Sequence, residues 1–176
     1  VGIDIDIAQA IADGLGMELK IEEMEFDSII SAVSTGKAQL GVSGMTVPEE
    51  RLKNINFTTP YTTAKQVIII RGAQAKSVNG EEDLKSASIG VQLGTTGDYA
   101  VEDIAGATAA QYNKGVDAVN DLMNGRVDCV IIDKNPALVF VSEYEGIVAL
   151  PGDQFDFAVE QYAIAIPKGD AKLATD

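Results

Sequence analysis

The stretch Gly41–Arg51 (GVSGMTVPEER) carries the polar groups best suited to bind a small anion. It begins as an apolar strand and enters a helix that we expect to start near Pro48, because Pro and acidic residues are typical of a first helical turn. Between strand and helix lie Ser43, Gly44 and Thr46. A guanidinium such as that of Arg51 donates two parallel hydrogen bonds to a carboxylate, and N–H groups at a helix start add to the same site. The pattern indicates carboxylate capture, although a plain strand–turn–helix junction with a solvated arginine has the same sequence features.

A second polar turn, Gly94–Gly97 (GTTG), follows an apolar stretch that we expect to form a strand over Ser88–Leu93. Hydroxyls and backbone donors at a helix start could bind a phosphate or a carboxylate. The turn lacks the lysine of a P-loop and the GxGxxG spacing of dinucleotide-binding proteins, which disfavours nucleotide binding. Thr95 or Thr96 could also serve as an ordinary N-cap, and capping is compatible with ligand contact.

Asp133 follows the apolar run Val127–Ile132, at the end of another expected strand. Its carboxylate could be exposed in a loop, it could cap the next helix, a role that Asn135 could also fill, or it could face a cation. Together with a carboxylate site at Arg51, an anionic acceptor at Asp133 would complement the zwitterion of an α-amino acid.

Three aromatic residues, Phe26, Phe57 and Tyr61, could pack over the apolar part of a ligand, although the sequence favours a place in the core for each of them taken alone. Glu160 and Gln161 adjoin a late strand and could face a ligand or lie in an exposed loop.

The composition excludes several classes of function. The 176 residues include 13 Lys and Arg, 27 Asp and Glu and no His, so the net charge is −14. Nucleic acid and anionic membranes are disfavoured as partners because both require basic patches. The lone Cys129 and the lack of His argue against a disulfide framework and against a zinc site. No apolar run approaches the ~20 residues that cross a bilayer.

Strand and helix signals alternate along the chain, which predicts an α/β fold with a mainly parallel sheet flanked by helices. Besides the strands already named, we expect short strands over Glu18–Glu22, Gln66–Arg71, Ala109–Tyr112, Ile147–Leu150 and Tyr162–Ile166. The stretches STGKAQLGVSG and MNGRVDCVIID share one order of features: a helix end, a glycine, a basic residue and a buried strand. Each strand delivers polar groups at its carboxyl end, where open α/β sheets bind ligands. Two similar lobes are the simplest interpretation.

At this point the chain resembles the extracytoplasmic solute-binding proteins of ABC importers, in particular the polar amino acid group with the type II periplasmic-binding-protein fold. The matching stretches occur in family order and cover nearly the whole chain. They are GIDIDIAQAIA, MEFDSIISAVSTGKAQLGVSGMT, NFTTPY, EDLKSASIGVQLGTTGDYA, NGRVDCVIIDK and QYAIAIPKGD.

The resemblance implies a role for each candidate site residue. Arg51 would bind the α-carboxylate of the ligand with help from Thr46, and Gly44 would accept a hydrogen bond from the α-ammonium. Asp133 would bind the same ammonium from the second lobe. The remaining predicted contacts are Thr95 and Thr96 to the carboxylate, Phe26 and Gln92 to the side chain, and Ser43 at a further contact position.

The resemblance also implies an organisation and a biological setting. Lobe one would comprise residues 1–71 and 161–176 and lobe two residues 72–160, joined by a two-strand hinge. The lobes would close around a polar or basic L-amino acid, without a cofactor, a metal or catalysis. The partner would be the membrane permease of an ABC importer. The protein would lie in the periplasm or be lipid-anchored at the outer face of the membrane.

Two departures from the family qualify these expectations. Pro48 stands where the family often has a hydroxyl-bearing N-cap. The chain begins after the family's first strand, at Val1 rather than Met, and ends at Asp176 before the last helices. We therefore expect either self-association that covers the missing surface or a chain that is part of a longer protein.

Two alternative functions remain open from the sequence. One is an enzyme similar to cyclohexadienyl dehydratases, which would need a proton-donating carboxylate, with Glu160 as the candidate. The other is the ligand-sensing domain of a receptor or regulator.

Overall fold

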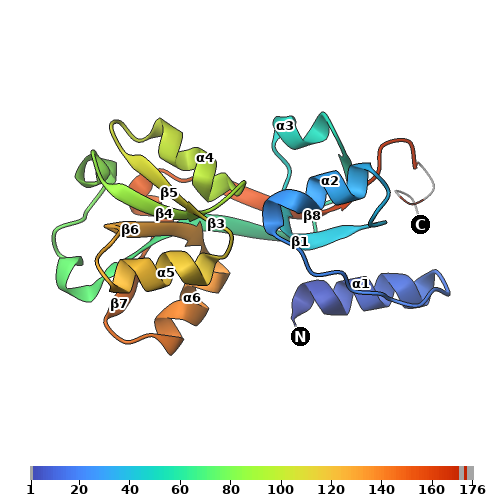
Figure 1. Cartoon of the computed structure of the whole chain (residues 1–176), viewed down its shortest axis with the longest axis horizontal. Coiled ribbons are helices and arrows are strands. Elements are labelled where there is room, and N and C mark those ends of the chain that lie inside the picture. Colours follow the sequence, from blue (N-terminus) through green and yellow to red (C-terminus); the bar gives the residue numbers. More distant parts are fainter. Residues whose placement is uncertain (1, 171–172, 174–176) are drawn as a thin grey trace. The chain divides into compact units, whose positions relative to one another are not determined.

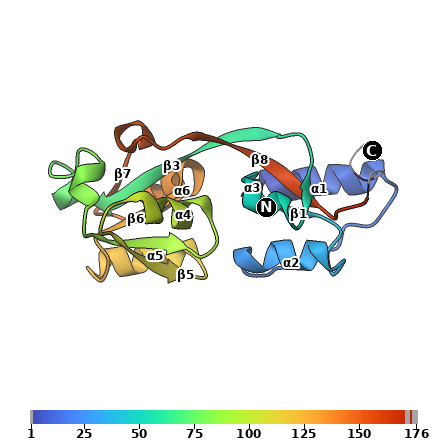
Figure 2. The same ribbon diagram turned by 90° about the horizontal axis from the view of Figure 1, so that it is seen from above.

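The computed structural model describes residues 2–170 and 173 and divides the chain into two compact units. Unit 1 comprises Val1–Thr63 and Glu160–Asp176, and unit 2 comprises Ala64–Val159. The chain passes between the units twice, within strand β3 (Thr62–Arg71) and at the start of strand β8 (Val159–Ile166) (Figures 1 and 2).

Unit 1 is built from two antiparallel pairs of strands and short helices. Strands β1 (Gly41–Thr46) and β2 (Asn56–Phe57) both pair with β8. Its helices are α1 (Ile3–Gly14), the 3-10 turn η1 (Phe26–Ser28), α2 (Ile29–Ser34) and α3 (Glu49–Leu52). The buried side chains that hold this unit together are Val33, Met45, Ile55 and Ala165. The core joins α2 to the β1–β8 pair, and that pair carries the stretch Gly41–Arg51.

Unit 2 contains a mixed sheet. Strands β4 (Ser88–Gln92) and β5 (Thr108–Tyr112) run parallel, as do β4 and β6 (Cys129–Asp133), whereas β3 pairs antiparallel with β6 and with β7 (Ile147–Leu150). The helices of this unit are α4 (Thr96–Asp103), α5 (Gly115–Met123) and α6 (Lys134–Glu143). Its 3-10 turns are η2 (Gly72–Gln74), η3 (Glu81–Leu84) and η4 (Gly152–Phe155).

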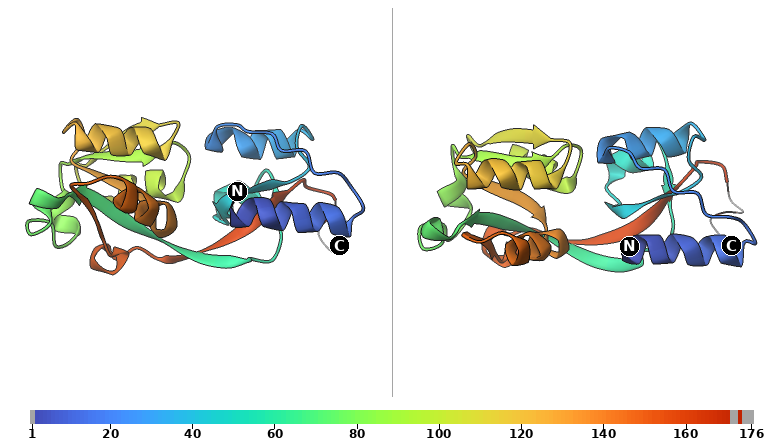
Figure 3. Two further views of the ribbon diagram at one scale, coloured as in Figure 1. Left: turned by 90° about the horizontal axis from the view of Figure 1, so that it is seen from below. Right: turned by 60° about the horizontal axis from the view of Figure 1, so that its bottom comes forward.

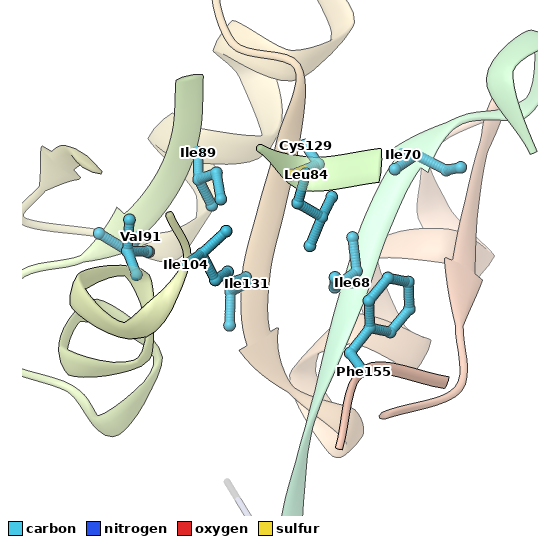
Figure 4. Close-up of a cluster of buried hydrophobic side chains, with 10 residues drawn as sticks. Ile68, Ile70, Leu84, Ile89, Val91, Ile104, Cys129, Ile131 and Phe155 are labelled. Atoms are coloured by element: carbon cyan, nitrogen blue, oxygen red, sulfur yellow. The ribbon is translucent and has the colours of Figure 1, made fainter. Parts of the chain in front are cut away.

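Two hydrophobic clusters cover the two faces of this sheet, because successive residues of a strand point to opposite faces. On β3, Ile68 and Ile70 belong to one cluster and Val67 and Ile69 to the other. The first cluster packs against α4 and includes Phe155, which lies beside Ile68 in Figure 4. The second packs against α5 and α6, which lie on the same side of the strands of unit 2 in both views of Figure 3. The continuous apolar run in β3 is therefore buried on both faces.

The predicted α/β class is confirmed, with two differences in the strands. The pairing is mixed rather than mainly parallel, because β3 and β8 run antiparallel to their described partners. The strand expected over Glu18–Glu22 is wrong: this segment has alternating side chains but no paired strand within the described residues. Alternation selects a face, whereas a strand also needs a hydrogen-bonded neighbour.

None of the helices among the described residues is long and apolar enough to cross a membrane.

Candidate functional site

Arg51 is the central group of the candidate site in unit 1. It lies in α3, yet its side chain is only 3% exposed. Its Nη1 atom donates to the backbone carbonyl of Thr46 at 2.9 Å and to the hydroxyl Oγ1 of the same residue at 3.1 Å. Charged side chains are rarely this buried, and binding an anion is one reason to hold a guanidinium there.

Phe26 contacts the same guanidinium. The Cζ atom of Arg51 lies 5.3 Å from the centroid of the Phe26 ring, within the range of a cation–π interaction. Phe26 begins η1 and also packs against the buried cluster of unit 1, so one ring serves both the core and the candidate site. The structure thus shows the core role of Phe26, and its contact with a ligand stays a prediction.

The turn expected at Ser43 and Gly44 is an irregularity inside β1. The register with β8 shifts between Gly41 and Met45, so the extra residues bulge out of the ladder. Gly44 has φ +53°, in the left-handed region where a side chain is strained. A Cβ at this position would also lie 3.3 Å from the Tyr162 ring, so glycine is favoured on two grounds.

A hydrogen-bonded tyrosine lies next to this bulge. The hydroxyl of Tyr61 donates to Oδ1 of Asp4 at 2.7 Å, and the Tyr61 ring lies 6.3 Å from that of Tyr162. Burial raises the pKa of Tyr61 above its usual value, and the hydrogen bond to the Asp4 carboxylate and the charge of that group raise it further. A hydrogen bond with the backbone of Gly44 acts in the opposite direction. Tyr61, which could have packed on a ligand, thus ties α1 to the residues around Gly44.

In unit 2, the GTTG turn is shaped by capping. Thr95 is the N-cap of α4: its hydroxyl accepts from the backbone N–H of Asp98 at 3.2 Å and donates to the carbonyl of Gln92 at 2.8 Å. The backbone N–H of Thr95 also donates to the Gln92 carbonyl, at 3.3 Å, so a ligand carboxylate could use either donor of Thr95 only by replacing one of these bonds. The buried Asp98 accepts from the backbone of Gly94 at 3.0 Å and from the Gln111 amide, which fixes the other end of the turn.

Asp133 and Thr96 are joined through a residue outside the predicted set, Gln66. Its Nε2 atom donates to the Thr96 hydroxyl at 3.0 Å and also to Oδ1 of Asp133. Asp133 stands at the N-cap position of α6 but makes no side-chain capping bond. Of the alternatives left open for this carboxylate, helix capping is therefore wrong, and contact with a cation stays a prediction.

Gln92 ends β4, and its amide donates to the backbone carbonyl of Asn113 at 3.2 Å. The backbone carbonyl of Gln92 accepts the hydrogen bond from the Thr95 hydroxyl, so these two residues lie close together in unit 2.

The structure thus groups the predicted residues into two sets. The unit 1 set is Phe26, Ser43, Gly44, Thr46 and Arg51, and the unit 2 set is Gln92, Thr95, Thr96 and Asp133. Sequence reasoning missed Gln66, because it adjoins an apolar run, and Asp98, because a charged residue ordinarily indicates an exposed position. The signal that could have found both is a single polar residue at a position where its neighbours predict burial.

Among the described residues, no group of three or more His, Cys, Asp or Glu side chains is arranged to hold a metal ion.

Known proteins have similar sequences and a similar structure. The chain is 25% identical over 173 residues to the L-cystine-binding protein TcyJ of Escherichia coli, covering 98% of this chain and spanning 64% of that relative's length. It is 34% identical over 182 residues to the L-arginine-binding protein of Pseudomonas aeruginosa, with 98% of this chain and 70% of the relative covered. The structure of holo ArgBP from T. maritima is similar with a TM-score of 0.91 and 39% identity, over 99% of this chain and 76% of that chain.

The family model of the bacterial extracellular solute-binding proteins, family 3, matches residues 1–175. That match covers nearly the whole chain, and the chain belongs to this family.

Proposed function

We propose that this chain captures an L-amino acid by the two charged ends that all amino acids share, and that it does so without chemical conversion. The observation that carries the proposal is the buried Arg51, fixed on Thr46 by two hydrogen bonds. The relatives reported above are named for binding amino acids, which supports capture as the activity.

The unit 1 set would bind the α-carboxylate. The guanidinium of Arg51 supplies a planar set of donors, and a carboxylate accepts two of them in parallel. Thr46 orients the guanidinium. Gly44, on the β1 bulge, would offer its carbonyl to the ammonium, and Ser43 would add a contact beside it.

The unit 2 set would bind the α-ammonium and assist with the carboxylate. Asp133 is an anion held in place by a neutral amide, which is a suitable partner for an ammonium group. The first-turn N–H groups at Thr95 and Thr96 favour negative charge, as helix starts do. One ligand would then contact both units, so binding would favour conformations in which both sets reach it.

Arginine is the first candidate ligand. The P. aeruginosa relative and the T. maritima protein, at 34% and 39% identity, are both named for arginine. The net charge of −14 also favours a cationic ligand over an anionic one, through the long-range field. Phe26 and Gln92 would face the ligand side chain, the first through its ring and the second through its amide.

The biological setting follows from the family and is part of the proposal. The family is described as extracellular, so we propose that the chain acts outside the cytoplasmic membrane. The ligand-bound form would deliver the amino acid to the membrane permease of an ABC importer.

A thermal-melting screen of residues 1–176 against the twenty amino acids tests the proposal. Ligand at about 100 times Kd stabilises by about 2.7 kcal/mol, which raises the melting temperature of a chain of this size by roughly 5–10 °C. We expect such a rise with L-arginine and little rise with L-glutamate. A cooperative melt that no amino acid shifts would overturn the proposal.

A further inference from the structure

We propose that Gln66 is a positioning residue for the ammonium-binding half of the site, because its one amide group sets the places of both Asp133 and Thr96. This inference rests on the proposed amino acid capture and adds to it the residue that keeps the unit 2 set in register. Gln66 itself is not required to touch the ligand.

The strand pairing brings Gln66 to Asp133. In the antiparallel β3–β6 pair, Gln66 lies directly opposite Asp133, and the following pairs are Val67 with Ile132 and Ile68 with Ile131. Gln66 is the first buried residue of β3, immediately before its apolar run, and Asp133 is the last residue of β6. The backbone ladder fixes their spacing before any side chain contact is made.

The chemistry of the two side chains determines the orientation of the amide. The carboxylate of Asp133 can only accept hydrogen bonds, so the Nε2 end of Gln66 must face it. The same Nε2 carries a second hydrogen, which it donates to the Thr96 hydroxyl at 3.0 Å. One planar NH₂ group thus fixes the separation between a carboxylate and the first residue of α4.

Burial makes this arrangement costly to change. Gln66 is 4% exposed, and a Cβ built on Gly97 would lie 3.0 Å from its Oε1 atom. The first turn of α4 therefore approaches the amide closely, and no residue larger than glycine fits there without displacing it. A buried amide held between a helix start and a strand end has little freedom to rotate away.

A role in positioning predicts a different response from a role in stability alone. Without the amide, the Asp133 carboxylate loses one of the groups that orient it, and ligand binding then bears the entropic cost of orienting it again. The effect on affinity should therefore vanish once the carboxylate is absent. If Gln66 had a purely structural role, its substitution would lower the free energy of unfolding but leave the affinity for the ligand unchanged. The effects of substituting Gln66 and Asp133 on affinity would then be independent.

The test is a double-mutant cycle measured by calorimetric titration with L-arginine. We expect Gln66→Met, which keeps the length and removes the donors, to weaken binding by about 10- to 100-fold, in line with the loss of a hydrogen bond to a charged group. The matched control is Gln154→Leu, which removes an exposed amide from the same unit and should leave binding unchanged. In the Asp133→Ala background, Gln66→Met should weaken binding by less than about twofold more, whereas in the Arg51→Lys background the full loss should remain.

The outcomes separate this inference from the function on which it rests. If wild-type protein binds L-arginine and Gln66→Met binds it equally well, or if the losses at Gln66 and Asp133 simply multiply, the positioning role is overturned. If Gln66→Met does not fold, Gln66→Asn keeps a buried amide that is one methylene too short, and the same loss and coupling are expected. If the wild-type protein binds none of the twenty amino acids, the proposed function fails first, independently of any variant.

Discussion

Arg51 and Thr46 are joined by two hydrogen bonds from a single guanidinium nitrogen, one to the backbone carbonyl and one to the hydroxyl of the same residue. Thr46 is the last residue of β1 and Arg51 lies in the short helix that follows. The arginine side chain therefore folds back on the strand from which its own helix emerges. This local closure holds a buried cation in one orientation.

The first prediction concerns the shape of that cation. Arg51→Lys keeps the charge but loses the planar pair of donors, so we expect affinity for L-arginine to fall about 100-fold or more. Calorimetric titration measures the change. Arg126→Lys is the matched control, because the Arg126 side chain is 71% exposed and pairs only with Asp121 in the described contacts. Wild-type affinity in the Arg51→Lys protein would show that the carboxylate binds elsewhere.

The second prediction concerns the anion in unit 2. Asp133→Asn preserves shape and the bond from Gln66 but removes the charge that would face the ammonium. We expect a loss of about 10- to 100-fold in affinity, from the weaker hydrogen bond of a neutral acceptor. Asp103→Asn, at the exposed end of α4, provides the same change away from the site. Equal affinities of the two variants would remove Asp133 from the ligand site.

A third prediction follows from the buried thiol. Burial, with the charge of Asp128, raises the pKa of Cys129 to about 12, and Arg71 opposes this shift. Below about pH 8.5 the thiol is protonated in both the folded and the unfolded chain, so it does not affect stability. Between about pH 8.5 and 12 only the unfolded chain releases the proton, so stability falls as the pH rises.

Urea unfolding between pH 8 and 10.5 measures this effect. The loss due to Cys129 should approach about 1.4 kcal/mol per pH unit above about pH 9.5. Cys129→Ala should be less stable than wild type at pH 8 because of the cavity, yet lose less stability as the pH rises. Parallel pH profiles for the two proteins would contradict the shift. The native protein should also resist thiol reagents at pH 8.

A fourth prediction separates stability from binding. Arg71, at the end of β3, donates to the carbonyl of Leu122 at 2.6 Å and to that of Val127 at 3.0 Å. Arg71→Met removes both bonds, one of them at the carboxyl end of α5, and we expect the free energy of unfolding to fall by about 2–3 kcal/mol. Affinity for L-arginine should stay within about twofold, since Arg71 belongs to neither candidate set. Arg126→Met, which breaks an exposed ion pair, should cost less than about 1 kcal/mol.

Local patterns predicted the elements of this fold better than their pairing. The apolar run in β3, the helix start after GTTG and the strand end at Asp133 were all marked by residues whose own chemistry demands that environment. The segment Glu18–Glu22 has the alternation of a strand without a described partner, and alternation alone cannot supply one. Pairing depends on distant segments, and short-range patterns do not encode it.

In the candidate site, too, contacts between residues close in the sequence could be predicted, whereas contacts between distant residues could not. Arg51 and Thr46 are five residues apart, so their proximity follows from one turn of the chain. Gln66 and Asp133 are 67 residues apart and meet only through the β3–β6 register. A glutamine at the start of an apolar strand gives no sign of the carboxylate opposite it, and only the fold identifies the pair.

The central claim is recognition of both ends of an amino acid, and ligand analogues test it most directly. Calorimetric titration would compare L-arginine with its methyl ester, which lacks the carboxylate, and with Nα-acetyl-L-arginine, which lacks the ammonium. We predict that each change weakens binding by about 100-fold or more, and that Arg51→Met no longer distinguishes the ester from the free acid. Equal binding of all three compounds by the wild-type protein would contradict the account, because neither Arg51 nor Asp133 would then hold the group assigned to it.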